Sequence, residues 1–222
     1  MSTSRIFAHR GSHSFHSESS KDSYLAAIND GADGFECDIR LTSDNQIVIW
    51  HDPTLERITG NTARISSSTL EELRAIWPIM TLEELLDISI AHKKDIAIET
   101  KHPVGFGRRI EKELAKLLKS KRNQIRQSGI EIFLMSFSWW ATSFNSKAPY
   151  VGTFLVLSKR HLPLARFAAA GLNIEIIRNG YIPQDPARTL VWTVNSAEDI
   201  KLCKELGVNV IITNDVPLAK SV

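Results

Sequence analysis

Short runs of apolar, β-branched residues alternate along the chain with longer stretches in which apolar residues recur every three or four positions. The short runs predict strands and the longer stretches predict amphipathic helices. The expected strands are residues 5–11, 34–41, 46–52, 95–101, 131–137, 150–157, 172–178, 189–195 and 208–214. The expected helices are residues 21–31, 66–76, 81–92, 108–119, 139–144, 164–170 and 196–207. Three of these helices, residues 66–76, 81–92 and 196–207, begin at serines or threonines suited to capping. Gly31 and Gly207 are suited to ending helices.

A strand-then-helix order repeated about eight times predicts parallel strands, in either a closed (β/α)₈ barrel or a doubly wound sheet. The first strand is followed by HRGSHS, which is not the glycine-rich loop of a dinucleotide-binding sheet, so the barrel is favoured. We expect one domain over residues 1–222. Residues 179–188 contain Gly180, Pro183 and Pro186 and predict that the sixth helix is reduced or missing.

Composition narrows the function classes. The 222 residues are 43% hydrophobic and 23% charged with a formal net charge of +2, which is too small to favour nucleic acid or an anionic membrane as a partner. No apolar run is long enough to span a membrane, and the N-terminus has no signal-peptide core. Cys37 and Cys203 give neither a disulfide framework nor zinc spacing. These features predict a cytoplasmic protein.

The strand GFECDIRL, residues 34–41, contains two carboxylates where a buried apolar segment is expected. Side chains alternate along a strand, so Glu36 and Asp38 share one face while Phe35 and Cys37 share the other. Burying an unpaired carboxylate is costly, and burying two neighbours costs more. A cation between them would offset that cost.

Several predicted strands end in polar residues, and a barrel gathers these ends at one rim, where active sites form. Glu36, Asp38 and Glu99 would meet there as a hard oxygen site suited to Mg²⁺ or Ca²⁺. His9 and His51 are candidates for proton transfer, and Arg10 and Lys101 add positive charge suited to a phosphate ester. A single Glu-x-Asp pair is most often a solvated strand edge, and His51 with Asp52 is most often a turn. The combination favours the metal interpretation.

Other chemically suggestive residues have simpler interpretations. The remaining histidines are expected on the surface or in loops, and both cysteines are expected to pack in the core. The Lys- and Arg-rich stretch 112–126 is interpreted as a solvated helix face rather than a nucleic-acid patch. Residues 137–140, FSWW, are interpreted as hydrophobic packing.

An ordered set of motifs extends over nearly the whole chain. The set comprises Ala8–Gly11, Glu18, Gly31–Asp33 followed by Glu36 and Asp38, His51–Asp52, residues 97–101 (AIETK), Met135–Ser138, residues 191–195 (VWTVN) and residues 206–216 (LGVNVIITNDV). Each piece is weak alone, but their order is specific, and the ordered set resembles the glycerophosphodiester phosphodiesterase family.

The resemblance implies a (β/α)₈ barrel that uses a divalent metal to cleave glycerophosphodiesters into sn-glycerol 3-phosphate and an alcohol. By matching position it assigns metal ligation to Glu36, Asp38 and Glu99, acid–base catalysis to His9 and His51, phosphate contacts to Arg10 and Lys101, and substrate contacts to Trp192 and Phe137. The attacking oxygen could come from water or from the substrate's own glycerol hydroxyl.

The chain departs from the family pattern in three places. Residues 17–20 are Ser-Glu-Ser-Ser where the family usually has Pro-Glu-Asn-Thr, so the carboxylate is kept but the rigid proline is lost. The family often continues from its His-Asp pair into an Arg-Thr-Thr run, which here is Arg57–Thr59, and residues 51–81 leave little room for a large inserted lid. The acidic pair expected after the last strand is Asn214–Asp215.

Two other functions are compatible with the residues. One is a phospholipase-D-like activity on lysophospholipids or sphingolipids, which would need an apolar groove at the rim. The other is a non-catalytic barrel that binds phosphorylated ligands, against which the intact histidines and carboxylates argue.

Overall fold

The computed structural model describes residues 4–101, 109–136 and 169–222, and the backbone of residues 151–157. Within these residues, eight parallel strands form a closed sheet, because β1 pairs with β2 on one side and with β9 on the other. The barrel strands are β1 (Arg5–His9), β2 (Gly34–Leu41), β4 (Asp95–Thr100), β5 (Ile132–Ser136), β6 (Val151–Leu157), β7 (Ala169–Asn173), β8 (Thr189–Trp192) and β9 (Val210–Thr213). The predicted (β/α)₈ barrel is confirmed.

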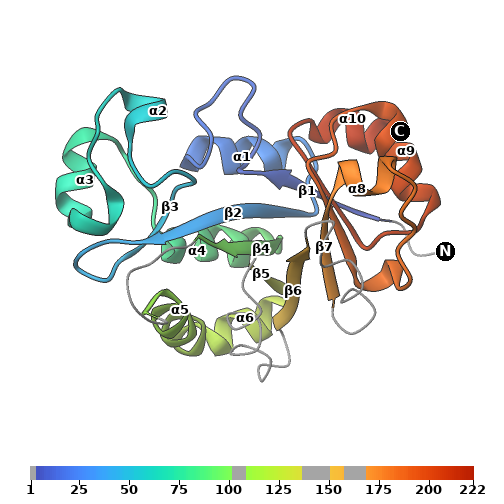
Figure 1. Cartoon of the computed structure of the whole chain (residues 1–222). Coiled ribbons are helices and arrows are strands. Elements are labelled where there is room, and N and C mark those ends of the chain that lie inside the picture. Colours follow the sequence, from blue (N-terminus) through green and yellow to red (C-terminus); the bar gives the residue numbers. More distant parts are fainter. Residues whose placement is uncertain (1–3, 102–108, 137–150, 158–168) are drawn as a thin grey trace.

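Helices cover the outside of this barrel (Figure 1). They are α1 (Lys21–Asn29), α4 (Leu82–His92), α5 (Arg109–Ser120), α6 (Arg122–Ser128), α8 (Ile174–Arg178), α9 (Ala197–Glu205) and α10 (Val216–Ser221). The predicted capping box of α4 is present, with Thr81 as the cap and Glu84 as its partner. No helix among the described residues combines the length and apolar character needed to cross a membrane.

The segment predicted as a strand over residues 46–52 does not belong to the barrel. Its central part forms β3 (Ile47–Ile49), which pairs antiparallel with β2. The turn between β2 and β3 is too short for the crossover connection that a parallel strand requires. The chain then forms α2 (Glu56–Thr59), the 3₁₀ helix η1 (Ile65–Ser67) and α3 (Leu70–Ile76), which lie with β3 at one side of the barrel (Figure 1).

The prediction of a strand over residues 172–178 is wrong beyond Asn173. The strand β7 lies earlier, and Ile174–Arg178 form α8, whose cap is the Asn173 side chain accepting a hydrogen bond from the Glu175 backbone N–H. A short apolar run fits a strand or a buried helix equally well, so the cap decided the outcome.

The prediction of a helix over residues 164–170 is also wrong at its end, since residues 169 and 170 belong to β7. Residues 164–168, like the predicted helix 139–144, lie outside the described residues. The crossover from β7 to β8 contains only the five-residue α8 and the 3₁₀ helix η3 (Pro186–Arg188), so the reduction of the sixth helix is confirmed.

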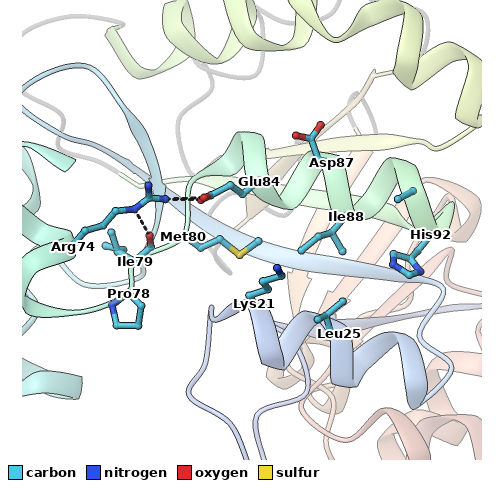
Figure 2. Close-up of a pocket in the computed structure, with 11 residues that line it drawn as sticks. Lys21, Leu25, Arg74, Pro78, Ile79, Met80, Glu84, Asp87, Ile88 and His92 are labelled. Carbon is cyan, nitrogen blue, oxygen red and sulfur yellow. Dashed lines mark hydrogen bonds and ion pairs between the residues drawn. The ribbon is translucent and has the colours of Figure 1, made fainter. Parts of the chain in front are cut away.

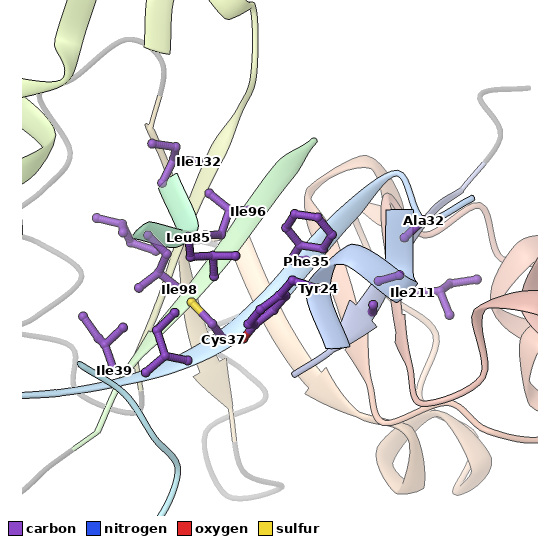
Figure 3. Close-up of a cluster of buried hydrophobic side chains, with 14 of the residues drawn as sticks. Tyr24, Ala32, Phe35, Cys37, Ile39, Leu85, Ile96, Ile98, Ile132 and Ile211 are labelled. Carbon is purple, nitrogen blue, oxygen red and sulfur yellow. The ribbon is translucent and has the colours of Figure 1, made fainter. Parts of the chain in front are cut away.

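The core has separate layers inside and outside the barrel wall. Outside, Phe35, Cys37 and Ile39 of β2 pack with residues of β4, α1 and α4 (Figure 3). Inside, Phe7, Phe133 and other apolar residues fill the barrel. Gly34 is required beside them, because a Cβ there would lie 2.6 Å from the Phe7 ring. These two layers leave the C-terminal end of the barrel interior to polar side chains.

A third hydrophobic cluster lies beneath β3, α2 and α3. Its members are Val48, Trp50, Leu55, Ile65, Leu73 and Ile79. All of them are buried, so the hairpin and its short helices have a core of their own beside the barrel.

Candidate active site

Three carboxylates converge inside the barrel at its C-terminal end. Glu36 and Asp38 project inward from β2, and Glu99 projects inward from β4, where it is the register partner of Asp38. Their exposed fractions are 3%, 1% and 8%, and one oxygen of each lies within 4.8 Å of the others. Cys37 lies on the opposite face in the outer core, which confirms the predicted strand phase.

Two cations lie against this cluster. Arg10 Nε is 2.8 Å from Asp38 Oδ2, while Lys101 Nζ is 2.9 Å from Asp38 Oδ1 and 2.7 Å from Glu99 Oε1. Burial acts to raise the pKa of Asp38, but Lys101 and Arg10 outweigh it, and that pKa lies below its usual range. Asp38 is therefore ionised at neutral pH.

Glu36 has the opposite electrostatic character. Burial and repulsion from Asp38 and Glu99 raise its pKa well above the ordinary value. Its Oε2 atom is buried and has no hydrogen-bond partner among the described residues. Burial and Asp38 also raise the pKa of Glu99. A divalent cation would relieve this repulsion and occupy the unsatisfied oxygen, so the three carboxylates fit such an ion.

His9 lies at the edge of the carboxylate cluster. Its Nε2 is 3.9 Å from Glu36 Oε2, and its Nδ1 is 2.7 Å from Asn214 Oδ1. Burial, aided by the positive charge of Arg10, lowers its pKa to about 4. The imidazole is therefore neutral at neutral pH.

His51 follows β3 by two residues, on the hairpin rather than on a barrel strand. Its Nδ1 is 2.8 Å from Asp52 Oδ1. Its backbone carbonyl accepts hydrogen bonds from Arg40 Nε and Nη2 at 3.0 and 2.7 Å. Burial lowers the pKa of His51, while the negative charge of Asp38 and the hydrogen bond to Asp52 oppose that change.

A chain of ion pairs that the sequence did not reveal joins the two histidine-bearing segments. Arg57 Nη2 is 2.5 Å from Glu18 Oε1, and Arg57 Nε is 2.5 Å from Asp52 Oδ2. Glu18 Oε1 is also 3.1 Å from Arg10 Nη1. Glu18 and Arg57 are 39 positions apart, so no spacing rule could have paired them.

The remaining predicted site residues have different outcomes. Trp192, at the end of β8, is partly exposed and packs against the inner cluster. Phe137 lies outside the described residues. His13, expected on the surface or in a loop, lies in the loop after β1, and its Nε2 is 3.3 Å from the same Asn214 Oδ1 that contacts His9. The loop after β1 brings it back to the rim.

A groove of about 800 Å³ lies elsewhere, on the outside of the barrel. Figure 2 shows Lys21 and Leu25 of α1 facing Asp87, Ile88 and His92 of α4 across it. It contains none of the residues predicted to take part in chemistry, so the barrel end is the candidate active site.

Adjacent residues on opposite faces of β2 provide a test of the metal site. Asp38→Asn should weaken Mg²⁺ or Ca²⁺ binding by at least about 10-fold, because a carboxylate of the cluster is lost. Cys37→Ser should keep metal affinity but lower the free energy of unfolding by about 1–3 kcal/mol, because it buries a hydroxyl among apolar groups. Calorimetric titration measures the metal affinity, and denaturant unfolding measures the free energy of unfolding. Unchanged metal binding in a folded Asp38→Asn protein would contradict the site.

Comparison with known proteins agrees with this geometry. The model of the glycerophosphoryl diester phosphodiesterase family matches residues 9–174. The "Probable glycerophosphodiester phosphodiesterase 1" of Mycobacterium tuberculosis is 29% identical in an alignment 241 positions long. The alignment covers 91% of this chain and 86% of that protein.

Solved structures share the fold at lower identity. The crystal structure of a glycerophosphodiester phosphodiesterase from Thermotoga maritima has a TM-score of 0.82 at 20% identity and covers 100% of this chain and 99% of its own. An Oleispira antarctica phosphodiesterase, solved with the product sn-glycerol-3-phosphate, has a TM-score of 0.74 at 20% identity. That match covers 99% of this chain and 96% of the Oleispira chain. Because the family model matches most of the sequence, the chain belongs to the glycerophosphoryl diester phosphodiesterase family.

Proposed function

We propose that this protein hydrolyses glycerophosphodiesters to sn-glycerol 3-phosphate and an alcohol, as one barrel domain over residues 1–222. The observation that carries the proposal is the buried cluster of Glu36, Asp38 and Glu99, flanked by two cations and a neutral histidine, in a barrel of this family. The product bound to the Oleispira antarctica phosphodiesterase supports the substrate class. Cys37 and Cys203 are unpaired and buried, which fits a cytoplasmic setting.

The three carboxylates would hold the divalent cation, and Mg²⁺ and Ca²⁺ are the candidates because both prefer carboxylate oxygens. When bound, the cation would stabilise negative charge that develops on the phosphoryl oxygens. Ligation would also require Glu36 to be ionised, which the cation's charge favours over the protonated form.

Arg10 and Lys101 are the proposed phosphate contacts. Both already lie against Asp38, so their positive charge is concentrated beside the carboxylate cluster. Donors fixed in this way stabilise the transition state without having to reorganise as the reaction proceeds. Trp192 and Phe137 are proposed to contact the rest of the substrate.

His9 is the proposed general base, because a neutral imidazole can accept the proton of the attacking oxygen. His51 is the proposed general acid, because the Asp52 carboxylate favours its protonated form and opposes the burial that lowers its pKa. The Nδ1 atom of His9 instead contacts the uncharged side-chain amide of Asn214. The proton on His51 would pass to the departing alkoxide.

The phospholipase-D-like alternative requires an apolar groove at the rim. The groove between α1 and α4 lies outside the barrel and does not supply that feature.

Removal of divalent cations tests the function directly. We expect turnover of glycerophosphocholine and glycerophosphoethanolamine to stop after chelation with EDTA and to return when Mg²⁺, Mn²⁺ or Ca²⁺ is added. The reason is that the charge of the carboxylate cluster and of the phosphate would otherwise remain uncompensated. Steady-state release of the free alcohol is the measurement. Full activity after exhaustive chelation would contradict the metal role.

The leaving group separates the roles of the histidines. His51→Ala should lower kcat on an alkyl diester by about 10²–10⁴-fold but far less on a nitrophenyl diester, whose leaving group needs no proton. His9→Ala should impair both substrates, because the attacking oxygen needs activation in each case. The measurement is kcat for both variants on both substrates, with circular dichroism confirming the fold. If the nitrophenyl diester instead restores kcat only in His9→Ala, the acid and base roles of the two histidines would be reversed.

The ion pairs of Arg57 should matter more for catalysis than for folding. Arg57→Ala should lower kcat by about 10-fold, because Asp52 and Glu18 lose their shared partner and His51 and Arg10 are held less well. The free energy of unfolding should change by less than about 1 kcal/mol, because Arg57 is half exposed.

The matched control is Arg74→Ala, which removes a similarly exposed ion pair with Glu84 away from the barrel end. It should leave kcat unchanged. Equal kcat losses in the two variants would show that Arg57 has no special link to the site.

A further inference from the structure

The imidazole of His9 is oriented by one neutral acceptor. Its Nδ1 lies 2.7 Å from Asn214 Oδ1, at the carboxyl end of β9, which is the neighbour of β1 in the barrel. An amide oxygen only accepts hydrogen bonds, so the ring must donate through Nδ1–H. In the neutral ring, Nε2 then carries the lone pair, and this atom faces Glu36 Oε2 at 3.9 Å.

Asn214 is itself held from two directions. Its backbone N–H donates to Asn195 Oδ1 at 2.9 Å, and the Thr213 hydroxyl donates to the same oxygen at 3.4 Å. The Asn214 side-chain oxygen also lies 3.3 Å from His13 Nε2, on the loop after β1. Two imidazoles therefore converge on one amide oxygen, which sets the orientation of that amide.

We propose that Asn214 is a positioning residue that keeps His9 in its Nδ1–H tautomer, so that Nε2 is the atom that receives a proton during the reaction. This role rests on the proposed function of His9 as the general base. The opposite tautomer would direct the Nδ1 lone pair at the lone pairs of Asn214 Oδ1, which is repulsive at 2.7 Å. It would also place a hydrogen on Nε2, where a general base needs a free lone pair.

An amide suits this role in both protonation states of the ring. Asn214 Oδ1 accepts the hydrogen bond from Nδ1–H whether Nε2 is unprotonated or protonated. The ring therefore does not need to turn as the proton moves. His9 is carried on β1 and Asn214 follows β9, so the contact joins two neighbouring barrel strands at the rim.

The tautomer is measurable without substrate or metal. In two-bond ¹H–¹⁵N correlation spectra of the full-length protein with labelled histidine, we expect His9 to show a protonated Nδ1 and an unprotonated Nε2. The signals are assigned by their loss in His9→Gln. A wild-type spectrum showing His9 protonated on Nε2 at neutral pH would overturn the proposal, whatever the activity.

Two substitutions at Asn214 test the link to turnover. Asn214→Leu removes the acceptor at similar size, and should mix the tautomers and lower kcat by about 10- to 100-fold. That loss is smaller than the about 10²–10⁴-fold expected for removing the base itself. KM should change by less than about threefold, because ground-state binding is retained. Asn214→Asp keeps an acceptor and should restore the tautomer and most of kcat.

Asn179→Leu makes the same chemical change at an exposed position after α8, and should alter neither measurement. A folded Asn214→Leu protein that keeps both the wild-type tautomer and kcat would overturn the proposal. If the wild-type protein turns over no glycerophosphodiester, the proposed function fails, while the tautomer spectrum still decides whether Asn214 orients His9.

Discussion

The rest of the structure depends on the burial of three carboxylates at one end of a closed barrel. Glu36, Asp38 and Glu99 are almost inaccessible to water, and like charges at such distances repel strongly in a medium of low dielectric constant. Arg10 and Lys101 offset the charge of Asp38 and part of the charge of Glu99. The Glu36 carboxyl keeps one oxygen that has no hydrogen-bond partner among the described residues. The site is thus held with an incomplete charge balance that a cationic partner would complete.

The candidate acid and base are supported by two different cores. His9 is carried by a barrel strand whose apolar neighbours fill the barrel interior. His51 is carried by the β2–β3 hairpin, which packs with α2 and α3 around its own cluster. Ion pairs of Glu18 with Arg57 and with Arg10 connect that hairpin region to the loop after β1. The relative position of the two imidazoles therefore depends on partly exposed ion pairs as well as on apolar packing.

The sequence pattern was a good guide where one face of a segment was clearly polar or apolar. Alternation in β2 placed Glu36 and Asp38 inside and Cys37 outside, as the structure has them. It was a poor guide for short apolar runs. The run after Asn173 has no distinguishing period and became a helix through a local cap. β3 has strand periodicity, but its antiparallel pairing with β2 depends on the tight turn before it.

By itself the sequence determined the repeated strand–helix order, the reduced sixth helix and a set of residues that approach the rim. These follow from local periodicity, from the glycine and prolines of residues 179–188 and from the alternation of strand side chains. Only the tertiary structure decided which distant residues touch. Arg57 meets Glu18, and Asn214 meets both His9 and His13, across intervals of 39 to 205 positions. Such contacts depend on where strands close and loops return, and no local pattern along the chain contains that information.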